Sequence, residues 1–435
     1  MLLEFRAKNF KSFKNELVFS MIPAPKQKGL DYSILKETIN NEEFKALSSS
    51  VIYGTNASGK TNIISAMDVF KNIILHGNIK NNLQQTPNAA VSNLEIIPNI
   101  DGDKLPIKFY IKFIDENILF EYELSIDIGT FLSNNTDRKI LMENLSINKN
   151  LIFSREDKTI IFGKLNIISN YFVENFKKNE ETLKDIAKNN TNKEELFLTN
   201  GFKTMFSQSL VNRMIDWLSF KFKTICMSNT LISSPVYDQE KIKFFKDENS
   251  NSAAKEIGSI NDIGYFSASK DSIPQMVSVL KKAAVPKMLP STIFESYGTI
   301  RFLNMFPIIC DVLYKGGTLI MDEFDASLHP MVVMNIINIF HNNDINIKKA
   351  QLIFNTHNPI FLNSNLFRRD EIKFVERTDD THISEIYSLS DFGTDGKYGV
   401  RNGEDYMKNY FVNKYGAIKN VEFETIIKKV LKIND

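Results

Sequence analysis

The sequence lacks the hallmarks of disulfide-stapled, secreted and membrane-spanning proteins. Its 435 residues include only two cysteines, Cys226 and Cys310, which argues against a disulfide scaffold and fits a reducing cytosol. No run of about 18 apolar residues occurs. The N-terminus alternates apolar and charged residues, which predicts a strand and not a signal peptide. We therefore expect a cytoplasmic protein with no membrane partner.

An excess of charge of either sign is also missing. The chain has 53 basic and 52 acidic residues, which gives a net charge of +1. The molecule as a whole therefore exerts no strong attraction on nucleic acid, although a balanced total does not exclude a local basic groove. Hydrophobic residues make up 43% and charged residues 24%, as in a globular protein of two or three domains.

Hydrophobic periodicity predicts strands at both ends and a change of pattern in the middle. We expect two strands within 2–21, a short strand at 48–54 followed by a helix, antiparallel strands over 106–163 and helices over 169–225. The polar stretch 229–262 has weak periodicity and is the best candidate for a mobile loop. After residue 295 the pattern returns to helix, strand, helix, strand, which is typical of a parallel sheet covered by helices.

These elements predict an α/β head that is split along the sequence. Residues 1–165 form its N-terminal half and include an antiparallel β lobe. Residues 166–290 form a helical insertion or lid, and residues 291–435 form the C-terminal half.

A complete phosphate-binding motif lies between the strand at 48–54 and the helix that follows it. The motif G-x-x-x-x-G-K-[ST] is matched by Gly54, Thr55, Asn56, Ala57, Ser58, Gly59, Lys60 and Thr61. In such a P-loop the glycines let the backbone wrap around phosphates, and the helix N-terminus adds its positive end. Lys60 is expected to bind the β- and γ-phosphates, and the Thr61 hydroxyl is expected to bind Mg²⁺. The motif thus predicts ATP and Mg²⁺ as ligands.

An acidic motif follows a buried strand in the C-terminal half. In GGTLIMDEFDASLHP, apolar residues up to Met321 precede Asp322 and Glu323. Carboxylates at the C-terminal end of a parallel strand lie where such sheets bind their ligands. Asp322 is expected to hold Mg²⁺ through its water shell, and Glu323 is expected to polarise the attacking water. The alternative, an acidic strand end that only caps a turn, loses weight beside a P-loop.

Three strings, GTNASGKTN, MDEFDASLHP and FNTHNP, resemble the ATPase heads of the ABC/SMC/RecF class. The strings NFKSF, ESYGTIRFL and KYGVRNGEDYMKNYFVNKYGAI extend the likeness to bacterial ATPases of the AAA type from abortive-infection and other phage-defence loci. The likeness covers both ends of the chain, and residues 165–290 contribute little. It implies an α/β fold, a P-loop NTPase of the ABC/SMC-head type, with an antiparallel β lobe and a helical insertion.

The resemblance also assigns roles to residues of this chain. In such heads a Ser-x-Gly segment at a helix N-terminus contacts the γ-phosphate bound by the opposite subunit. Ser296, Gly298 and Thr299 in ESYGT match this segment, although the string departs from the common LSGGQ. His357 follows the apolar strand QLIFN and is similar to the switch histidine that senses the γ-phosphate. Asp325 resembles the aspartate of the loop that crosses the dimer interface.

Further positions have a counterpart in the family. They are Asn62, which extends the P-loop; Lys11, Ser12 and Phe13, which occupy the region that approaches the nucleotide in relatives; and Gln84 or Gln85, as candidates for the glutamine that links the helical lobe to Mg²⁺. The adenine contact is not assigned to a single residue. We expect His329 to be a packing or turn residue.

Other motifs are weaker alternatives. Arg377 and His382 have the R-x₄-H spacing of some RNases, but that chemistry needs both side chains on one helical surface, and FVERTDDTHISEIYSL predicts a β-hairpin. The string DEFD also occurs as a helicase box, but the surrounding motifs favour an ABC-like head. No Cys and His cluster has zinc spacing. The tail after His357 is too short and too poor in paired acids for an appended Toprim nuclease.

These expectations lead to one principal function and two alternatives. We expect an ATP-driven switch that senses phage infection and controls a separately encoded effector, expected to be a nuclease. ATP would bridge two heads of a homodimer or a larger oligomer. A RecF-like DNA-binding repair or recombination ATPase is the alternative that shares the same head. A toxin with its active site within 165–290 is the third hypothesis, although that stretch offers no catalytic constellation. DNA or a phage component stays open as a further partner.

Overall fold

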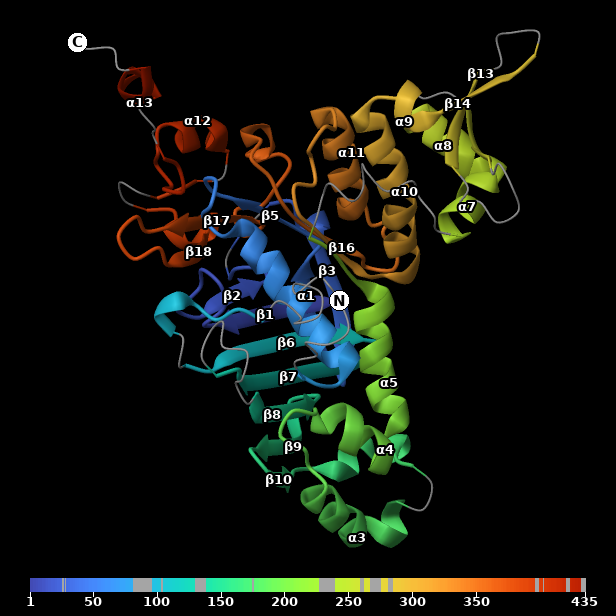
Figure 1. Cartoon of the computed structure of the whole chain (residues 1–435), viewed down its shortest axis with the longest axis vertical. Coiled ribbons are helices and arrows are strands. Elements are labelled where there is room, and N and C mark those ends of the chain that lie inside the picture. The colour runs from blue at the N-terminus through green and yellow to red at the C-terminus, as the bar shows by residue number, and fades with distance from the viewer. Residues whose placement is uncertain are drawn as a thin grey trace.

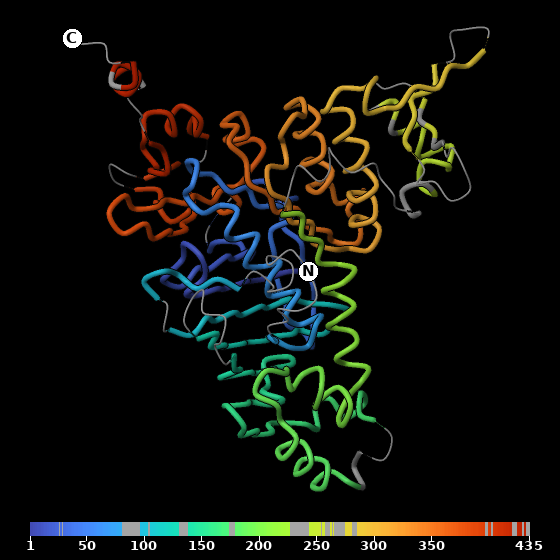
Figure 2. Tube along the Cα trace, in the orientation of Figure 1, coloured from blue at the N-terminus to red at the C-terminus, as the bar shows by residue number. Residues whose placement is uncertain are grey.

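The structure is a computed structural model, and its helices and strands are labelled in Figure 1. It describes residues 1–25, 27, 29–80, 96–102, 105–129, 138–173, 176–226, 239–258, 262–266, 275–280, 285–395, 399–401, 403–419 and 423–431. Figure 2 shows blue N-terminal segments beside orange and red C-terminal segments in the upper part of the molecule, where strands from both ends pair.

An antiparallel sheet of seven strands unites the first strands with the expected β lobe. Its strands are β1 (Leu2–Lys8), β2 (Leu17–Ser20), β6 (Ile107–Asp115), β7 (Ile118–Asp127), β8 (Lys139–Ile147), β9 (Asn150–Glu156) and β10 (Thr159–Phe162). Their order is β10-β9-β8-β7-β6-β1-β2. Every second residue of β6 from Ile107 to Ile111 is buried, as expected for a strand with one face on a core. The strands predicted within 2–21 and over 106–163 are confirmed.

A mainly parallel sheet of six strands joins the two halves of the sequence. Its strands are β5 (Ser49–Tyr53), β11 (Phe222–Ile225), β15 (Thr318–Met321), β16 (Gln351–Asn355), β17 (Ile372–Arg377) and β18 (Ser384–Ser388). The order is β11-β15-β16-β5-β17-β18, and only β18 runs antiparallel to its neighbour. Because β5 lies between β16 and β17, neither half of the sequence completes this sheet alone. The split α/β head is confirmed.

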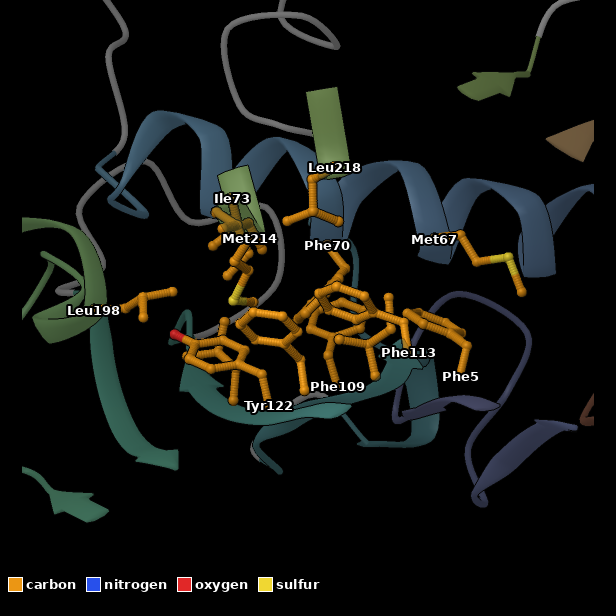
Figure 3. Close-up of a cluster of buried hydrophobic side chains, with 14 of the residues drawn as sticks. Phe5, Met67, Phe70, Ile73, Phe109, Phe113, Tyr122, Leu198, Met214 and Leu218 are labelled. Atoms are coloured by element: carbon orange, nitrogen blue, oxygen red, sulfur yellow. The ribbon is translucent and has the colours of Figure 1, made fainter. Parts of the chain in front are cut away.

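Helix α1 (Lys60–His76) packs on the antiparallel sheet through a cluster of aromatic rings (Figure 3). The Phe70 ring centroid lies 5.9 Å from that of Phe5 and 5.8 Å from that of Phe109. The same core includes residues of β5, β15 and β16, so α1 contacts both sheets. The helix ends at Gly77, whose φ of 69° suits glycine and lets its N–H bond back to the last turn. The position of Lys60 is therefore fixed by packing on both sides.

Helices from the C-terminal half cover the parallel sheet. They are α10 (Tyr297–Lys315), α11 (Pro330–His341) and α12 (Tyr406–Phe411), with the 3₁₀ turns η6 (Pro359–Phe361) and η7 (Leu389–Phe392). The last helix, α13 (Phe423–Leu431), lies apart from the sheet (Figure 1). A second core joins α10 and α11 to the face of β5, β15 and β16 that α1 leaves free. His329 precedes α11, and its Nδ1 accepts a hydrogen bond from the Met331 N–H at 3.2 Å. The expected turn role of His329 is confirmed.

Smaller elements fill the rest of the described chain. They are η1 (Asp31–Ser33), β3 (Ile34–Ile39), β4 (Glu42–Leu47), η2 (Ile100–Gly102), η3 (Leu165–Tyr171), α3 (Phe176–Asn189), the π-turn η4 (Leu198–Phe202), α4 (Lys203–Met205), α5 (Gln208–Asp216), the π-turn η5 (Trp217–Lys221), α7 (Gln239–Lys246), α8 (Glu248–Gly258), β12 (Asp262–Phe266), β13 (Gln275–Leu280), β14 (Lys287–Pro290) and α9 (Ser291–Phe294). β12, β13 and β14 form an antiparallel sheet.

The middle of the chain differs from the expected run of helices. Helix was predicted up to residue 225, but Phe222–Ile225 is strand β11, which pairs in parallel with β15. The apolar spacing of this short segment fits either structure, and the open edge of β15 decides in favour of a strand. The three-stranded sheet likewise lies inside the stretch 166–290, which was predicted to be helical. The boundaries of the three predicted domains stay a prediction.

The predicted loop at 229–262 is also wrong where the structure describes it, because α7 and α8 occupy 239–258. Phe244 of α7 packs edge-on against Phe306 of α10, with 5.7 Å between ring centroids. Phe245 is buried in a cluster with Phe302. Most residues of these two helices are polar, so the sequence shows little helical periodicity apart from Phe244 and Phe245. None of the helices within the described ranges is long and apolar enough to cross a membrane.

Candidate nucleotide-binding site

The P-loop leaves the carboxyl end of β5 and turns directly into α1. Gly59, with a φ of 112°, precedes Lys60, the first residue of the helix. A Cβ at Gly59 would lie 2.6 Å from Ser384 Oγ and 2.7 Å from Ser12 Oγ, so a side chain has no room here. The Ser58 hydroxyl is buried and has no hydrogen-bond partner among the described residues. The loop therefore has both the backbone conformation and an unused polar group that a bound anion requires.

Lys60 points back into the loop. Its Nζ donates hydrogen bonds to the carbonyl oxygens of Gly54 at 2.8 Å and Thr55 at 2.9 Å. Burial lowers the pKa of Lys60 to about 8, and the carboxylates of Asp322 and Glu323 oppose that shift. Its hydrogen-bond partners within the described part of the chain are both carbonyl oxygens, so this cation with a lowered pKa gains from a phosphate that reaches it.

The hairpin β17–β18 braces the outside of the P-loop. Ser384 Oγ donates to the Ser58 carbonyl at 2.6 Å, and Arg377 Nη1 donates to the Ala57 carbonyl at 3.3 Å. Arg377 Nε also donates to the His382 carbonyl at 2.9 Å within the hairpin. The predicted β-hairpin is confirmed, and Arg377 supports the loop through its side chain. Arg377 ends β17 and His382 lies in the turn before β18, so the two residues do not share one helical surface.

The turn after β1 meets this hairpin at the P-loop, where the Ser384 N–H donates a hydrogen bond to the Ser12 carbonyl oxygen at 2.8 Å. Asn62 Nδ2 donates to Ser12 Oγ at 2.8 Å, and Lys11 Nζ donates to Ser65 Oγ at 2.6 Å. Phe13 is buried. Lys11 and Ser12, which relatives place near the nucleotide, therefore contact the first two turns of α1. The candidates Gln84 and Gln85 lie outside the described residues.

The two predicted Mg²⁺ ligands lie next to each other. Thr61 Oγ1 donates a hydrogen bond to Asp322 Oδ1 at 3.0 Å. Asp322 is buried at the carboxyl end of β15, and burial raises its pKa, while hydrogen bonds from Asn355 and Thr61 oppose the shift. Hydroxyl and carboxylate oxygens are ligands that Mg²⁺ prefers. Together with the Ser58 hydroxyl and Lys60, this pair fits a magnesium ion held beside phosphates.

Asn355, which sequence analysis quoted only as a letter of FNTHNP, links the acidic motif. Its Nδ2 donates to Asp322 Oδ1, and its Oδ1 accepts from the Glu323 N–H at 2.6 Å. Glu323 adopts a φ of 48°, a left-handed conformation that is unusual for a residue other than glycine, and its side chain is exposed. Asn355 thus fixes the backbone that presents the Glu323 carboxylate. The signal that could have found it is its place, one residue after the apolar run LIF.

Arg301 is a second residue that the sequence did not single out. It is fully buried in α10, and it donates through Nη2 to the carbonyl oxygen of Glu323. Burial lowers the pKa of Arg301, and the charges of Glu323 and Asp325 counter this shift. Asn355 and Arg301 therefore hold the Glu323 peptide from two sides. The strand β11 adds a third support, because the Ile225 carbonyl accepts from the Asp322 N–H at 2.9 Å.

His357 and Asp325 lie beside this acidic edge. His357 is exposed, and partial desolvation together with the charge of Lys60 lowers its pKa. Asp325 accepts a hydrogen bond from the Thr356 side chain, and burial raises the pKa of Asp325. The histidine therefore lies at the strand end, in the field of both Lys60 and the carboxylates. Its predicted role as a γ-phosphate sensor stays a prediction.

The ESYGT segment forms the start of α10. Ser296 caps the helix by accepting a hydrogen bond from the Thr299 N–H at 3.1 Å, and its Oγ lies 2.9 Å from Thr299 Oγ1. A Cβ at Gly298 would lie 2.2 Å from the Ser327 carbonyl, so only glycine lets α10 approach the turn after β15 this closely. Both hydroxyl side chains are accessible to solvent, and neither bonds to the P-loop among the described residues.

The fold and this site define a P-loop NTPase with a split α/β head. The chain belongs to the family described as "AAA domain, putative AbiEii toxin, Type IV TA system", whose model matches residues 49–217 and 231–363, more than half of the sequence. No curated protein matches the sequence.

Among solved structures, SMC heads are similar to this chain at low sequence identity. An SmcHead bound to the C-winged helix domain of ScpA has 13% identity and a TM-score of 0.39, over 89% of this chain and 97% of that one. The SMC head domain from Thermotoga maritima has 12% identity and a TM-score of 0.38, over 89% and 98%. An Smc head bound to the C-terminal domain of ScpA derived from Pyrococcus furiosus has 13% identity and a TM-score of 0.37, over 89% and 96%.

Proposed function

We propose that this protein is an ATP-binding and ATP-hydrolysing molecular switch that responds to infection and controls a separately encoded effector, a nuclease in the simplest case. One observation carries the ATPase proposal. Thr61 Oγ1 lies 3.0 Å from Asp322 Oδ1 beside the P-loop, and Asn355 forms hydrogen bonds with both the Asp322 carboxylate and the Glu323 N–H. The family description, with its putative AbiEii toxin and Type IV TA system, supports the defence context.

In this proposal the P-loop binds the triphosphate. Lys60 exchanges its bonds to the Gly54 and Thr55 carbonyl oxygens for bonds to phosphate oxygens. Thr61 and Asp322 would hold Mg²⁺, which when bound neutralises charge on the phosphates. The backbone N–H groups of the loop and the N-terminus of α1 add to the positive field.

Glu323 and His357 then act on hydrolysis. Glu323 accepts a proton from the attacking water, whose oxygen bonds to the γ-phosphorus as the bond to the ADP oxygen breaks. The backbone bonds of Glu323 to Asn355 and Arg301 keep its carboxylate at the edge of the sheet. His357 donates a hydrogen bond to the γ-phosphate and reports its loss. The sheet edge that carries Glu323 and His357 therefore has two states, one with ATP bound and one after hydrolysis.

A second copy of the chain completes the site. The Ser296 and Thr299 hydroxyls are accessible and make no bond to the P-loop of their own chain within the described residues. In the proposed head-to-head dimer, Ser296, Gly298 and Thr299 of one copy face the γ-phosphate bound by Lys60 of the other. ATP is then the bridge between copies, and its hydrolysis releases them.

The substitution Gly298→Ala is expected to weaken ATP-dependent association by about ten-fold, because an added Cβ displaces the α10 N-terminus from the Ser327 carbonyl and misplaces Ser296. Light scattering at several protein concentrations with ATP and Mg²⁺ measures the effect. Gly264→Ala is the matched control, since a Cβ there meets neighbours only at 3.5 Å. Association of the Gly298→Ala protein at the wild-type concentration would exclude the proposed role of this segment.

The proposed function is tested with Lys60→Ala, which is expected to weaken ATP binding by about ten- to thirty-fold, since one charge-assisted contact to phosphate is lost. Calorimetry measures the affinity, and phage plating on cells that carry the chain with its neighbouring genes measures protection. Lys36→Ala, at an exposed position of β3, is the matched control. A Lys60→Ala protein that binds ATP normally and still protects cells would overturn the proposal.

A further inference from the structure

A cavity of about 730 Å³ opens between the P-loop helix and the helix that carries Ser296. Its walls come from Lys71 of α1, Lys223 of β11, Lys243 of α7, and a stretch of α10 from Pro307 to Tyr314. We name it the lysine cavity. Its volume lies within the range of small-molecule sites, about 300–1,000 Å³. None of the motifs discussed above contributes a residue to it.

The charges that line the lysine cavity are mainly positive. Among the described lining residues, Lys71, Lys223 and Lys243 are accompanied by one carboxylate, Asp311, which forms an ion pair with Lys315 at 2.6 Å. Burial lowers the pKa of Lys71, and the charge of Lys223 lowers it further. The charge of Asp68 opposes this lowering, but Asp68 already accepts hydrogen bonds from Thr224 and Asn72. An anion placed between the lysines relieves their mutual repulsion.

The remaining walls are apolar and partly aromatic. Phe244 is held edge-on by Phe306, and Tyr314 is 82% exposed at the rim. Pro307 and Ile308 line one side, and burial raises the pKa of the Cys310 thiol to about 11, as expected in apolar surroundings. Apolar walls with a few charged groups are the usual composition of a ligand site.

We infer that the lysine cavity binds a small anionic molecule that carries a flat apolar ring and is about the size of a nucleotide, and that its occupancy biases the ATP site. The lysines receive the anion, and Phe244 and Tyr314 receive the ring. The second part of this inference rests on the proposed function, and the first part does not.

Three elements connect the cavity to the ATP site. Lys71 lies on α1, the helix that starts at Lys60. Thr224 precedes Ile225, whose carbonyl accepts from the Asp322 N–H at 2.9 Å. In α10, Pro307 has no N–H to donate to the turn before it, and it separates the half with Ser296 and Arg301 from the half that lines the cavity. A ligand against Pro307 therefore acts at the weakest point of the helix that carries Ser296.

The test uses 1-anilinonaphthalene-8-sulfonate, an anion with fused apolar rings, on the full chain without ATP. We expect one binding site, and we expect Lys71→Gln and Lys223→Gln each to weaken binding by about ten-fold. The uncharged analogue N-phenyl-1-naphthylamine should bind all three proteins alike. Lys158→Gln, an exposed lysine between β9 and β10, is the matched control, and Lys71→Arg should restore binding. Unchanged thermal unfolding shows that the variants are folded.

The position of the bound sulfonate is tested by alkylation of Cys310, which lines the cavity. The sulfonate should slow the reaction of Cys310 with a small maleimide, as measured by peptide mass spectrometry. The inference would be overturned if both glutamine variants bound the sulfonate with wild-type affinity, or if the sulfonate did not slow the alkylation of Cys310. Lys60→Ala separates the two proposals, because it should weaken ATP binding and leave the affinity for the sulfonate unchanged. If ATP binds and the sulfonate affinity is the same with and without it, the coupling to the ATP site is wrong.

Discussion

Replacement of Glu323 by glutamine is expected to lower the rate of ATP hydrolysis by about 10³-fold and to leave ATP affinity unchanged. Glutamine has nearly the shape of glutamate but cannot accept the proton of the attacking water. The backbone of this residue is held through its N–H by Asn355 and through its carbonyl by Arg301, and the substitution preserves both bonds. Single-turnover release of phosphate measures the rate, and calorimetry measures the affinity.

The control is Glu385→Gln, which changes an exposed carboxylate on β18, in the hairpin β17–β18 that contacts the P-loop. It should hydrolyse ATP at the wild-type rate. If Glu323→Gln does so too, the water is polarised by another group and the role given to Glu323 is wrong. The Glu323→Gln protein should also gain mass with ATP and Mg²⁺ in light scattering, and Ser296→Arg should abolish that gain. If the molar mass is the same with and without ATP, the protein is either a constitutive assembly or lacks a required partner.

The local parts of this site could be predicted from the sequence, because each has a short motif in a recognisable context. Residues 54–61 lie between an apolar strand and an amphipathic helix, so their backbone conformation is encoded within about a dozen residues. Asp322 follows the three apolar residues Leu319–Met321, and the carboxyl ends of parallel strands share one edge of a sheet. That general rule places the P-loop and Asp322 close together, and the 3.0 Å hydrogen bond from Thr61 to Asp322 agrees with it.

Asn355 could not be predicted with the same methods, because its position depends on the register between two strands. Met321 of β15 pairs with Phe354 of β16, so the next residue on each strand, Asp322 and Asn355, meet at the sheet edge. A shift of the register by one residue would turn Asn355 to the other face. No local pattern encodes that register, which is set by the packing of α1, α10 and α11 on the two faces of the sheet.

The errors in the middle of the chain have the same origin. Phe222–Ile225 continues the helical spacing of the apolar residues before it, and only the open edge of β15 makes it a strand. Helices α7 and α8 were missed because their sequence is polar, and they depend on two phenylalanines that pack on α10. In each case a partner distant in sequence selects the structure.

Replacement of Asn355 by leucine is expected to have the second largest effect, a fall in ATP hydrolysis of about 10²-fold with a loss of about 1–3 kcal/mol in the free energy of unfolding. Leucine is similar in size but leaves the partly buried Glu323 N–H without its acceptor and removes a donor from Asp322. The Glu323 backbone, at a φ of 48°, then loses the hydrogen bond that holds its N–H. Single-turnover hydrolysis and urea unfolding measure the two effects.

Asn346→Leu separates loss of stability from loss of chemistry. Asn346 is also buried, and it precedes β16 at the end of the strand away from the site, where its Nδ2 donates to the Phe340 and Ala350 carbonyl oxygens at 2.8 Å. Its replacement should cost about the same unfolding free energy, 1–3 kcal/mol, with hydrolysis near the wild-type rate. Asn355→Asp should fall between, because it keeps an acceptor for the Glu323 N–H but sets a second carboxylate beside Asp322. Equal hydrolysis by Asn355→Leu and Asn346→Leu would mean that Asn355 only stabilises the fold; a much slower Asn355→Leu protein would show that the geometry of Glu323 depends on this one amide.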